Sequence, residues 1–136
     1  MKIMLDEGAK MPTRAHPYDA GLDLYSMEDG YIRANQSRTF STGVHIAIPE
    51  GMVGLVKSKS GLMCNHGILT DGTIDAHYTG SIRVCLFNHS DFDYRVNAGD
   101  KIAQLVIVPC MLTRLELVDS LEETDRGDNG FGSTGR

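Results

Sequence analysis

The chain has 136 residues, which is enough for one hydrophobic core and too few for two, so we expect a single domain. A formal net charge of −5 and a sequence pI near 5.4 argue against a general binder of nucleic acid or of anionic membranes, because a diffuse basic surface is missing. No stretch approaches the length of a membrane span, and three widely spaced cysteines match neither a zinc motif nor a disulfide framework.

Short runs of alternating apolar and polar residues recur along the chain, separated by Gly, Pro, Asn or Asp. They predict β-strands at residues 30–34, 38–48, 52–57, 81–88, 92–96 and 102–109. In one of these runs Ile82, Val84 and Leu86 fall on the same face, which is a period of two. A proline-led turn is predicted at residues 49–52.

The best candidate for a helix is a turn or two at residues 60–65, between Gly61 and Gly67. Many short strands at regular spacing predict an all-β sandwich or jelly roll over residues 1–125. Because such a fold has no obvious central pocket, we expect a small-molecule site at a seam between subunits.

Residues 126–136 form a glycine-rich tail with an arginine at each end, two hydroxyl side chains and a lone aromatic. Glycines let backbone N–H groups approach an anion closely, and the arginine fork matches phosphate oxygens. Phe131 offers a face for stacking on a nucleobase. The tail therefore indicates a phosphate clamp, although a disordered polar end is the commoner role of such termini.

Four more segments carry polar residues at characteristic spacing, namely Ala20–Leu24, Lys59–Leu62, Gly72–Gly80 and Gly99–Val106. With the tail as a fifth, their order and spacing resemble the motifs of trimeric dUTP pyrophosphatases (dUTPases) from about residue 11 to residue 136. Each string is a weak signal alone, but five in register are specific.

The resemblance implies a jelly-roll (β-clip type) homotrimer with three equivalent shared sites. Each site would combine the hairpin of one subunit, the phosphate-binding motifs of a second and the tail of a third. The implied reaction is hydrolysis of dUTP to dUMP and pyrophosphate, which keeps uracil out of DNA and supplies dUMP for dTMP synthesis.

The segment around Asp75 has a turn-like centre between strand-like flanks and is predicted to be a β-hairpin. The resemblance implies that Asp75 orients and partly deprotonates a water for in-line attack on the α-phosphorus. It also implies that Tyr78 packs against the deoxyribose, and that the main chain near Gly72, Thr73 and residues 82–84 reads the uracil edge. On the residues alone, a turn-capping role for Asp75 and a strand-end role for Tyr78 stay open.

The resemblance implies phosphate-binding roles for Lys59, Ser60, Gly61 and Gln104. Ser60 would donate to the oxygen between the α- and β-phosphates, where negative charge grows as the bond breaks. Lys59 stands where the family usually has Arg, so its contact should be looser, since lysine is a point donor rather than a fork. Gln104 would donate to the α-phosphate; the alternative is a polar residue on the solvent face of a strand.

In the tail, the resemblance implies that Arg126, Ser133 and Thr134 hold the β- and γ-phosphates, with Gly132 in the same substrate-binding segment. Phe131 would cover the uracil, and closure of the tail would exclude water.

The implied cofactor is Mg²⁺, held mainly by the triphosphate oxygens and by waters. Asp23 is then at most an outer-sphere partner, and a turn residue that bonds local amides is an equal alternative. No two of the five histidines have metal-ligand spacing, so each is expected to be structural or solvent-facing. His77, where the family often has a second Asp, lies close enough to affect the pH dependence of the reaction.

Two alternative functions stay open. A dCTP deaminase shares the fold and several phosphate motifs, but it would need another acid/base set in the hairpin. A regulatory protein would keep the scaffold and use nucleotide occupancy to control a protein partner. We expect no direct binding of nucleic acid and no membrane association, and a cytoplasmic location, with nuclear or viral delivery left open.

Overall fold

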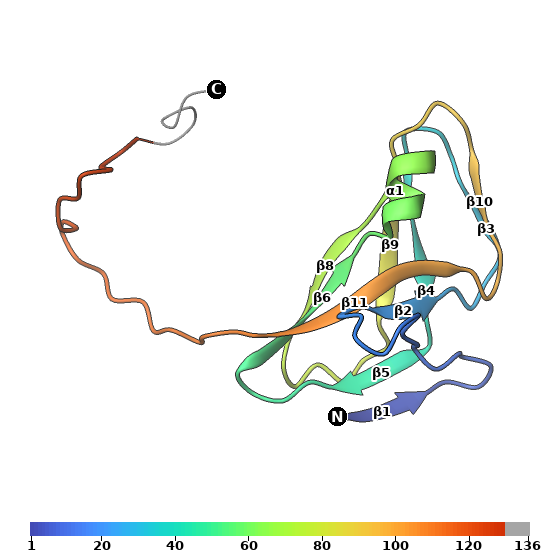
Figure 1. Cartoon of the computed structure of the whole chain (residues 1–136), viewed down its shortest axis with the longest axis horizontal. Coiled ribbons are helices and arrows are strands. Elements are labelled where there is room, and N and C mark those ends of the chain that lie inside the picture. The colour runs from blue at the N-terminus through green and yellow to red at the C-terminus, as the bar shows by residue number, and fades with distance from the viewer. Residues whose placement is uncertain (130–136) are drawn as a thin grey trace.

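The computed structural model describes residues 1–129, and Figure 1 shows their arrangement. Within this part of the chain there are eleven short strands and one short helix. In chain order they are β1 (Lys2–Leu5), β2 (Leu22–Tyr25), β3 (Gly30–Ile32), β4 (Ser37–Ser41), β5 (Val44–Ala47), β6 (Met52–Lys57), α1 (Ser60–His66), β7 (Ile68–Leu69), β8 (Asp71–Ile74), β9 (Arg83–Asn88), β10 (Tyr94–Val96) and β11 (Lys101–Pro109).

The strands form four small antiparallel sheets. The largest has the order β2-β11-β6-β8, and a second has the order β4-β9-β7. Two further pairs, β1 with β5 and β10 with β3, complete the arrangement. Strands that are neighbours in a sheet are mostly distant in sequence, which is typical of a jelly roll and confirms the predicted all-β fold.

The core lies between the sheets and is made of aliphatic side chains around Phe40, which is fully buried. In β9 the side chains of Val84 and Leu86 are buried, whereas those of Arg83 and Phe87 are exposed. This alternation confirms the period of two that was read from the sequence, because successive side chains of a strand point to opposite faces.

The helix prediction is confirmed, and so is the turn before β6, where the Met52 N–H donates to the Pro49 carbonyl at 3.2 Å. Helix α1 ends at Gly67, whose left-handed backbone (φ 66°) lets its N–H reach the carbonyls of Leu62 and Met63. A side chain in this conformation would be strained, which explains the glycine.

The predicted single strand at 38–48 is wrong, since the chain turns at Gly43 and forms β4 and β5 in different sheets. Gly43 has φ 64°, and a Cβ there would lie 2.4 Å from the Met27 sulfur and 2.6 Å from the Ala9 Cβ. The short strands β1, β2 and β7 were not predicted, because two to four residues are too few for an alternation to be recognised.

The predicted β-hairpin around Asp75 is also wrong. Strand β8 pairs with β6, whereas β9 pairs with β4 and β7, so residues 75–82 form a loop that crosses from one sheet to another. The crossing is fixed at Ile82, whose N–H donates to the Val44 carbonyl at 2.8 Å and whose carbonyl accepts from the Thr42 hydroxyl at 2.7 Å.

After β11 the chain leaves the body, as the orange to red segment in Figure 1 shows. The Cys110 N–H still donates to the Gly51 carbonyl at 2.8 Å, but residues 111–129 contain no strand or helix and are exposed. Several apolar side chains of this segment are more than three-quarters exposed, namely Met111, Leu112, Leu115, Leu117 and Leu121. Over residues 1–129, no helix is long and apolar enough to cross a membrane.

Candidate functional site

A pocket of about 370 Å³ brings three of the sequence motifs together. It forms where β2, β11 and β6 lie side by side, and Gln104 on β11 is opposite Asp23 on β2 and Lys57 on β6. The pocket is lined by Ala15, Asp19, Ala20, Gly21, Asp23, Lys59, Gln104 and Val106. Sheet pairing thus joins residues that are up to about ninety positions apart in the chain.

Asp23 is the buried charge of this pocket, with 6% of its surface exposed. Its carboxylate oxygens accept from the Lys59 ammonium at 2.5 Å and from the Lys101 ammonium at 2.7 Å. Burial raises the pKa of Asp23, but the hydrogen bonds and charges of Lys101 and Lys59 together outweigh burial and hold that pKa below its ordinary value of 3.8. The carboxylate is therefore ionised at neutral pH.

The alternative role for Asp23, a turn residue that bonds local amides, is wrong. Asp23 lies within strand β2, and its side chain bonds two lysines that are distant in sequence. Two ammonium groups around one carboxylate leave a net charge of +1. The cluster formed by Asp23, Lys59 and Lys101 is thus suited to an anion, with Lys59 facing the pocket.

Lys101 was not predicted as a site residue. The available signal was its place in the fourth motif, three residues before Gln104, but the sequence cannot show that it lies beside Asp23. The same ion pair raises the pKa of Lys101, first through the hydrogen bond to Asp23 and then through its negative charge.

Gln104 is half-buried in the pocket rather than on the solvent face of a strand. Its side-chain N–H₂ donates to the Ser58 carbonyl at 3.1 Å, which leaves its second N–H for another acceptor. A side chain at position 21 would occupy the same space, because a Cβ on Gly21 would lie 2.3 Å from the Gln104 Oε1. The glycine of the first motif therefore makes room for the glutamine of the fourth.

Ser60 and Gly61 are the first residues of α1 and are exposed. They directly follow Lys59, which ends the extended segment after β6. A Cβ on Gly61 would meet no atom within 4 Å, so the space beside this turn is open within one chain.

Asp75 and Tyr78 lie in the exposed loop after β8. The Tyr78 N–H donates to the Asp75 carbonyl at 3.2 Å, and the Tyr78 hydroxyl donates to the Ser81 carbonyl at 3.1 Å. The ring folds over Gly80, where a Cβ would lie 2.4 Å from the hydroxyl oxygen. His77 has a left-handed backbone (φ 67°), and its Nε2 lies 3.0 Å from the Glu50 carboxylate.

The loop is not close to the lysine cluster within one chain. Gly54 is opposite Ile74 and Lys57 is opposite Asp71, so Asp75 continues β8 at one end of β6 while Lys59 follows the other end. Six residues of extended chain separate the two ends, which corresponds to about 20 Å at ~3.3 Å per residue. The fold therefore brings Asp23, Lys59 and Gln104 together but leaves Asp75 and Tyr78 apart from them.

Gly72 and Thr73 belong to β8, which is the edge strand of its sheet. Within the sheet as described, the outer side of an edge strand presents backbone N–H and C=O groups without a ladder partner. Such a row can hydrogen-bond the edge of a planar base.

Arg126 lies in the extended segment, where its Nε–H donates to the Asn129 carbonyl at 3.1 Å. Phe131, Gly132, Ser133 and Thr134 lie outside the described residues. Over residues 1–129 there is no group of three or more His, Cys, Asp or Glu side chains placed to hold a metal ion.

Comparison with known proteins gives consistent matches along almost the whole chain. A sequence model of the dUTPase family matches residues 7–135. Deoxyuridine 5'-triphosphate nucleotidohydrolase from Clostridium tetani is 43% identical, with 98% of this chain and 94% of that protein covered. The Arabidopsis thaliana protein of the same name is 46% identical, with 96% and 80% covered.

Solved structures agree with these matches. The dUTPase of Staphylococcus bacteriophage 80alpha, in a structure with dUpNHpp, superposes with a TM-score of 0.93 at 32% identity and covers 99% of this chain and 98% of that chain. A mutant dUTPase from phage phi11 of S. aureus superposes with a TM-score of 0.82 at 31% identity over 90% of this chain and 98% of that chain, and it coordinates a structural Mg(II) ion.

Proposed function

The chain belongs to the dUTPase family and is a dUTP nucleotidohydrolase, and we propose that its active sites, which convert dUTP to dUMP and pyrophosphate, are shared between subunits. The observation that carries the proposal is the pocket in which Asp23, Lys59 and Gln104 meet, together with its separation from Asp75. We propose that the anion pocket binds the phosphates and that the loop supplies a carboxylate, Asp75, for the hydrolysis.

The pocket would bind the triphosphate. The net charge of +1 on the cluster of Asp23, Lys59 and Lys101 attracts the polyanion, and Gln104 has one N–H left to donate to the α-phosphate. Ser60, exposed at the start of α1, would donate to the oxygen that bridges the α- and β-phosphates. Because that oxygen gains negative charge as its bond breaks, the contact is strongest in the transition state.

Asp75 would supply the chemistry. Its carboxylate accepts a hydrogen bond from a water and takes up the proton as the water oxygen attacks the α-phosphorus. The bond from the α-phosphorus to the bridging oxygen breaks on the opposite side, and pyrophosphate leaves. Tyr78, held by its bond to the Ser81 carbonyl, would pack against the deoxyribose and exclude a 2′-hydroxyl.

The α-phosphorus must lie within a few ångströms of both Ser60 and Asp75. Along β6 these residues are about 20 Å apart in one chain, so a productive site needs Asp75 from one subunit and Ser60 from another. A homotrimer with cyclic symmetry supplies three such sites. The exposed leucines at 112–121 support contact of this segment with another subunit, because a row of apolar side chains is stable only when covered.

The proposal divides the chain into a β domain (residues 1–125) and a tail (residues 126–136). In the tail, Arg126, Ser133 and Thr134 would bind the outer phosphates, with Gly132 giving the backbone freedom to approach them and Phe131 covering the uracil. Gly72 and Thr73, on the free edge of β8, would read the base through their backbone groups.

Magnesium is proposed as the cofactor, and the donor set fits an ion that arrives with the substrate. Asp23 already accepts from two lysines, whose charges would repel a cation, so it is no direct ligand. The triphosphate oxygens and waters would hold Mg²⁺, which neutralises phosphate charge when bound. A cytoplasmic location is part of the same proposal and agrees with three free cysteines.

The test is pyrophosphate release from dUTP, with UTP, dCTP and dTTP measured alongside, with Mg²⁺ and after its chelation. We expect release that is selective for dUTP and lost on chelation. Ammonia release from dCTP would instead support a deaminase, and binding of dUTP without turnover would support a regulatory protein.

The Asp75→Asn variant tests whether Asp75 is the general base. It should keep the KM for dUTP within a few-fold and lower kcat by about 10²- to 10⁴-fold, the usual contribution of a positioned general base. Asp71→Asn, at the first residue of β8 and four residues before Asp75, is the matched control and should retain kcat. Near-normal turnover of Asp75→Asn would remove Asp75 from the mechanism.

A further inference from the structure

The loop of residues 75–82 carries both residues proposed for chemistry and sugar selection, yet no β-ladder of its own holds it. Its far end is fixed at Ile82 by Thr42 and Val44. Its middle is held by a side chain from β5, because Nδ1 of His45 lies 2.8 Å from the carbonyl oxygen of Thr79. Thr79 directly follows Tyr78, so the contact between His45 and Thr79 fixes the backbone next to the residue proposed to select the sugar.

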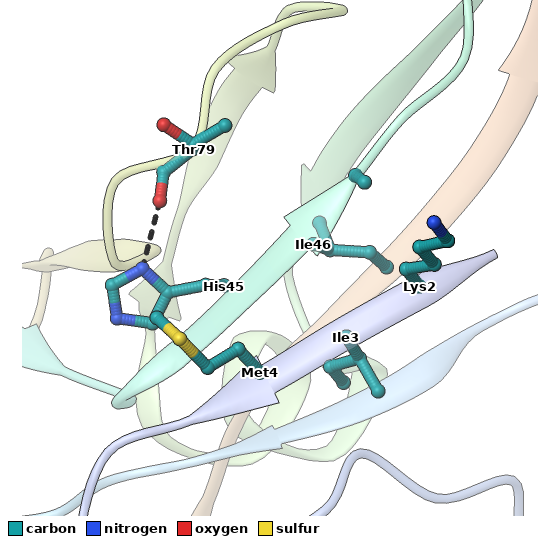
Figure 2. Close-up of a pocket in the computed structure, with 7 residues that line it drawn as sticks. Lys2, Ile3, Met4, His45, Ile46 and Thr79 are labelled. Carbon is teal, nitrogen blue, oxygen red and sulfur yellow. Dashed lines mark hydrogen bonds between the residues drawn. The ribbon is translucent and has the colours of Figure 1, made fainter.

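Figure 2 shows the surroundings of this contact in a pocket of about 220 Å³ between β1, β5 and the loop. The His45 ring points at the Thr79 carbonyl, and the Met4 side chain on β1 lies against the ring. The other ring nitrogen, Nε2, lies 3.1 Å from the Asp6 carboxylate in the turn after β1. The imidazole thus spans from the N-terminal segment to the loop.

Both partners of the ring are acceptors, since one is a backbone carbonyl and the other a carboxylate. A neutral imidazole has one N–H and can satisfy only one of them, whereas the imidazolium donates to both. The contact with the Thr79 carbonyl is the largest cause that raises the pKa of His45 above its ordinary value of 6.5, and Asp6 adds to it against partial desolvation. Lys2 is the other charged group of this pocket, and Figure 2 shows it at the opposite end from the ring.

We propose that His45 is a positioning residue for dUTP hydrolysis, whose protonated ring ties the Thr79 carbonyl to Asp6 and so sets the loop that carries Asp75 and Tyr78. The inference rests on the proposed function, because it concerns the same site. When the ring loses a proton, its remaining N–H stays with the charged Asp6 carboxylate, which is the stronger acceptor, and the bond from Nδ1 to the Thr79 carbonyl is lost. Misplacement of Asp75 then lowers kcat more than it raises KM.

The first experiment is the pH profile of kcat and KM for four full-length proteins, namely wild type, His45→Phe, His45→Asn and Asp6→Asn. In the wild type, kcat should decrease as pH rises through the pKa of His45, which lies above 6.5. His45→Phe has no donor, so its kcat should lie about tenfold below the wild-type value at low pH and approach the wild-type value above the pKa of His45, with KM changed less than about threefold.

The two other variants separate positioning from a merely structural role. His45→Asn keeps an N–H donor at the position of Nδ1 that does not titrate, so it should restore kcat and lose the alkaline decline. Asp6→Asn removes the charge that supports the imidazolium and should move the decline to lower pH. His89→Asn changes an exposed histidine that does not line this pocket, so it is the matched control and should behave as wild type. Wild-type profiles for His45→Phe and Asp6→Asn, with unchanged melting temperatures, would overturn the inference.

A second readout does not depend on activity. The Gly80 amide belongs to the same peptide group as the Thr79 carbonyl, so its ¹⁵N–¹H shift should titrate with the midpoint of the His45 ring protons. That titration should vanish in His45→Asn, and a Gly80 shift that does not change with protonation of His45 would overturn the inference. If the wild type released no pyrophosphate from dUTP, the proposed function would fail. The Gly80 titration would still show whether protonated His45 bonds the Thr79 carbonyl.

Discussion

At the scale of single residues, the charge balance around Asp23 decides what the pocket can bind. One carboxylate that is almost fully buried would be unfavourable alone, but two ammonium groups compensate it. The cluster leaves one positive charge, and Lys59 presents it to the pocket. Lys59, which stands where the resemblance expects arginine, is held by Asp23 and lines the pocket in which the phosphate contact is proposed.

Asp23→Asn should lower the free energy of unfolding by about 1–3 kcal/mol at neutral pH, since bonds to a charged acceptor are lost and two lysines are left close together. The folded pKa of Asp23 lies below 3.8, so its contribution is present above that pH and disappears as pH falls through the folded value. Urea denaturation at a series of pH values checks this. A difference between variant and wild type that grew below pH 4 would contradict the prediction.

Tyr78 is the residue for which substrate selectivity, rather than rate, is the informative measurement. Tyr78→Ala should reduce the preference for dUTP over UTP by about 10- to 100-fold, because it removes the ring that is proposed to exclude the 2′-hydroxyl. Tyr78→Phe keeps the ring and loses the bond to the Ser81 carbonyl, and it should retain most of the selectivity. The ratio of kcat/KM for the two nucleotides checks both, and unchanged selectivity of the alanine variant would assign sugar discrimination elsewhere.

At the scale of elements, strand β6 joins the lysine cluster to the loop that carries Asp75, which the proposal assigns to two different shared sites. It lies between β11 and β8 in the largest sheet, with the lysine cluster at one end and the loop of residues 75–82 at the other. At its centre, Gly54 is buried opposite Ile74, and a Cβ there would lie 2.8 Å from Ile48 Cδ1 and 3.0 Å from Leu105 Cδ1. The absence of a side chain at position 54 leaves room for Ile48 and Leu105, and for Ile74 on β8, whose Cβ would lie 3.3 Å away.

Gly54→Ala should therefore destabilise the protein by about 1–3 kcal/mol, the usual effect of overpacking a core. It should also lower kcat, because β8 moves and carries Asp75 with it. Gly72→Ala, on β8 itself, is the control for stability, since its Cβ would have only ordinary contacts of 3.6 Å with Val56. Thermal denaturation of both variants checks the difference, and equal stabilities would show that the sheet adjusts freely.

At the scale of the whole molecule, the separation of Asp75 from Ser60 in one chain predicts complementation between inactive variants. Asp75→Asn chains and Ser60→Ala chains should each have low activity. Trimers refolded from an equal mixture should recover up to about one quarter of wild-type sites, because a random pair of chains supplies both intact residues with that frequency.

The control is a mixture of Asp75→Asn chains with chains that carry both substitutions, which should stay inactive. Turnover measured after refolding, with sedimentation to confirm the oligomer, distinguishes the cases. No recovery in the first mixture would place both residues of a site in one chain.

Removal of residues 126–136 tests the tail at the same scale. The truncated chain should keep the fold and the oligomer, because the described body ends its strands at Pro109, and it should lose most of its turnover, because the outer phosphates and the base are no longer covered. Activity and sedimentation together check this, and full turnover without the tail would refute the clamp.

The sequence by itself determined the features that depend on residues close together in the chain. The period of two in β9, the helix at 60–66, the turn at Pro49 and the five dUTPase motifs all repeat or cluster within a few positions, so their physical cause is local. The family and the dUTP reaction followed from those motifs. Asp75, Tyr78 and the phosphate-binding residues remain predictions for mutagenesis.

Only the tertiary structure decided which distant residues meet. Lys101 beside Asp23, Gln104 turned into the pocket, the loop in place of a hairpin at Asp75 and the contact of His45 with Thr79 depend on which strands become neighbours. Strand pairing is set by burial of the whole core and not by the pattern of any one segment, so the same local sequence is compatible with several partners.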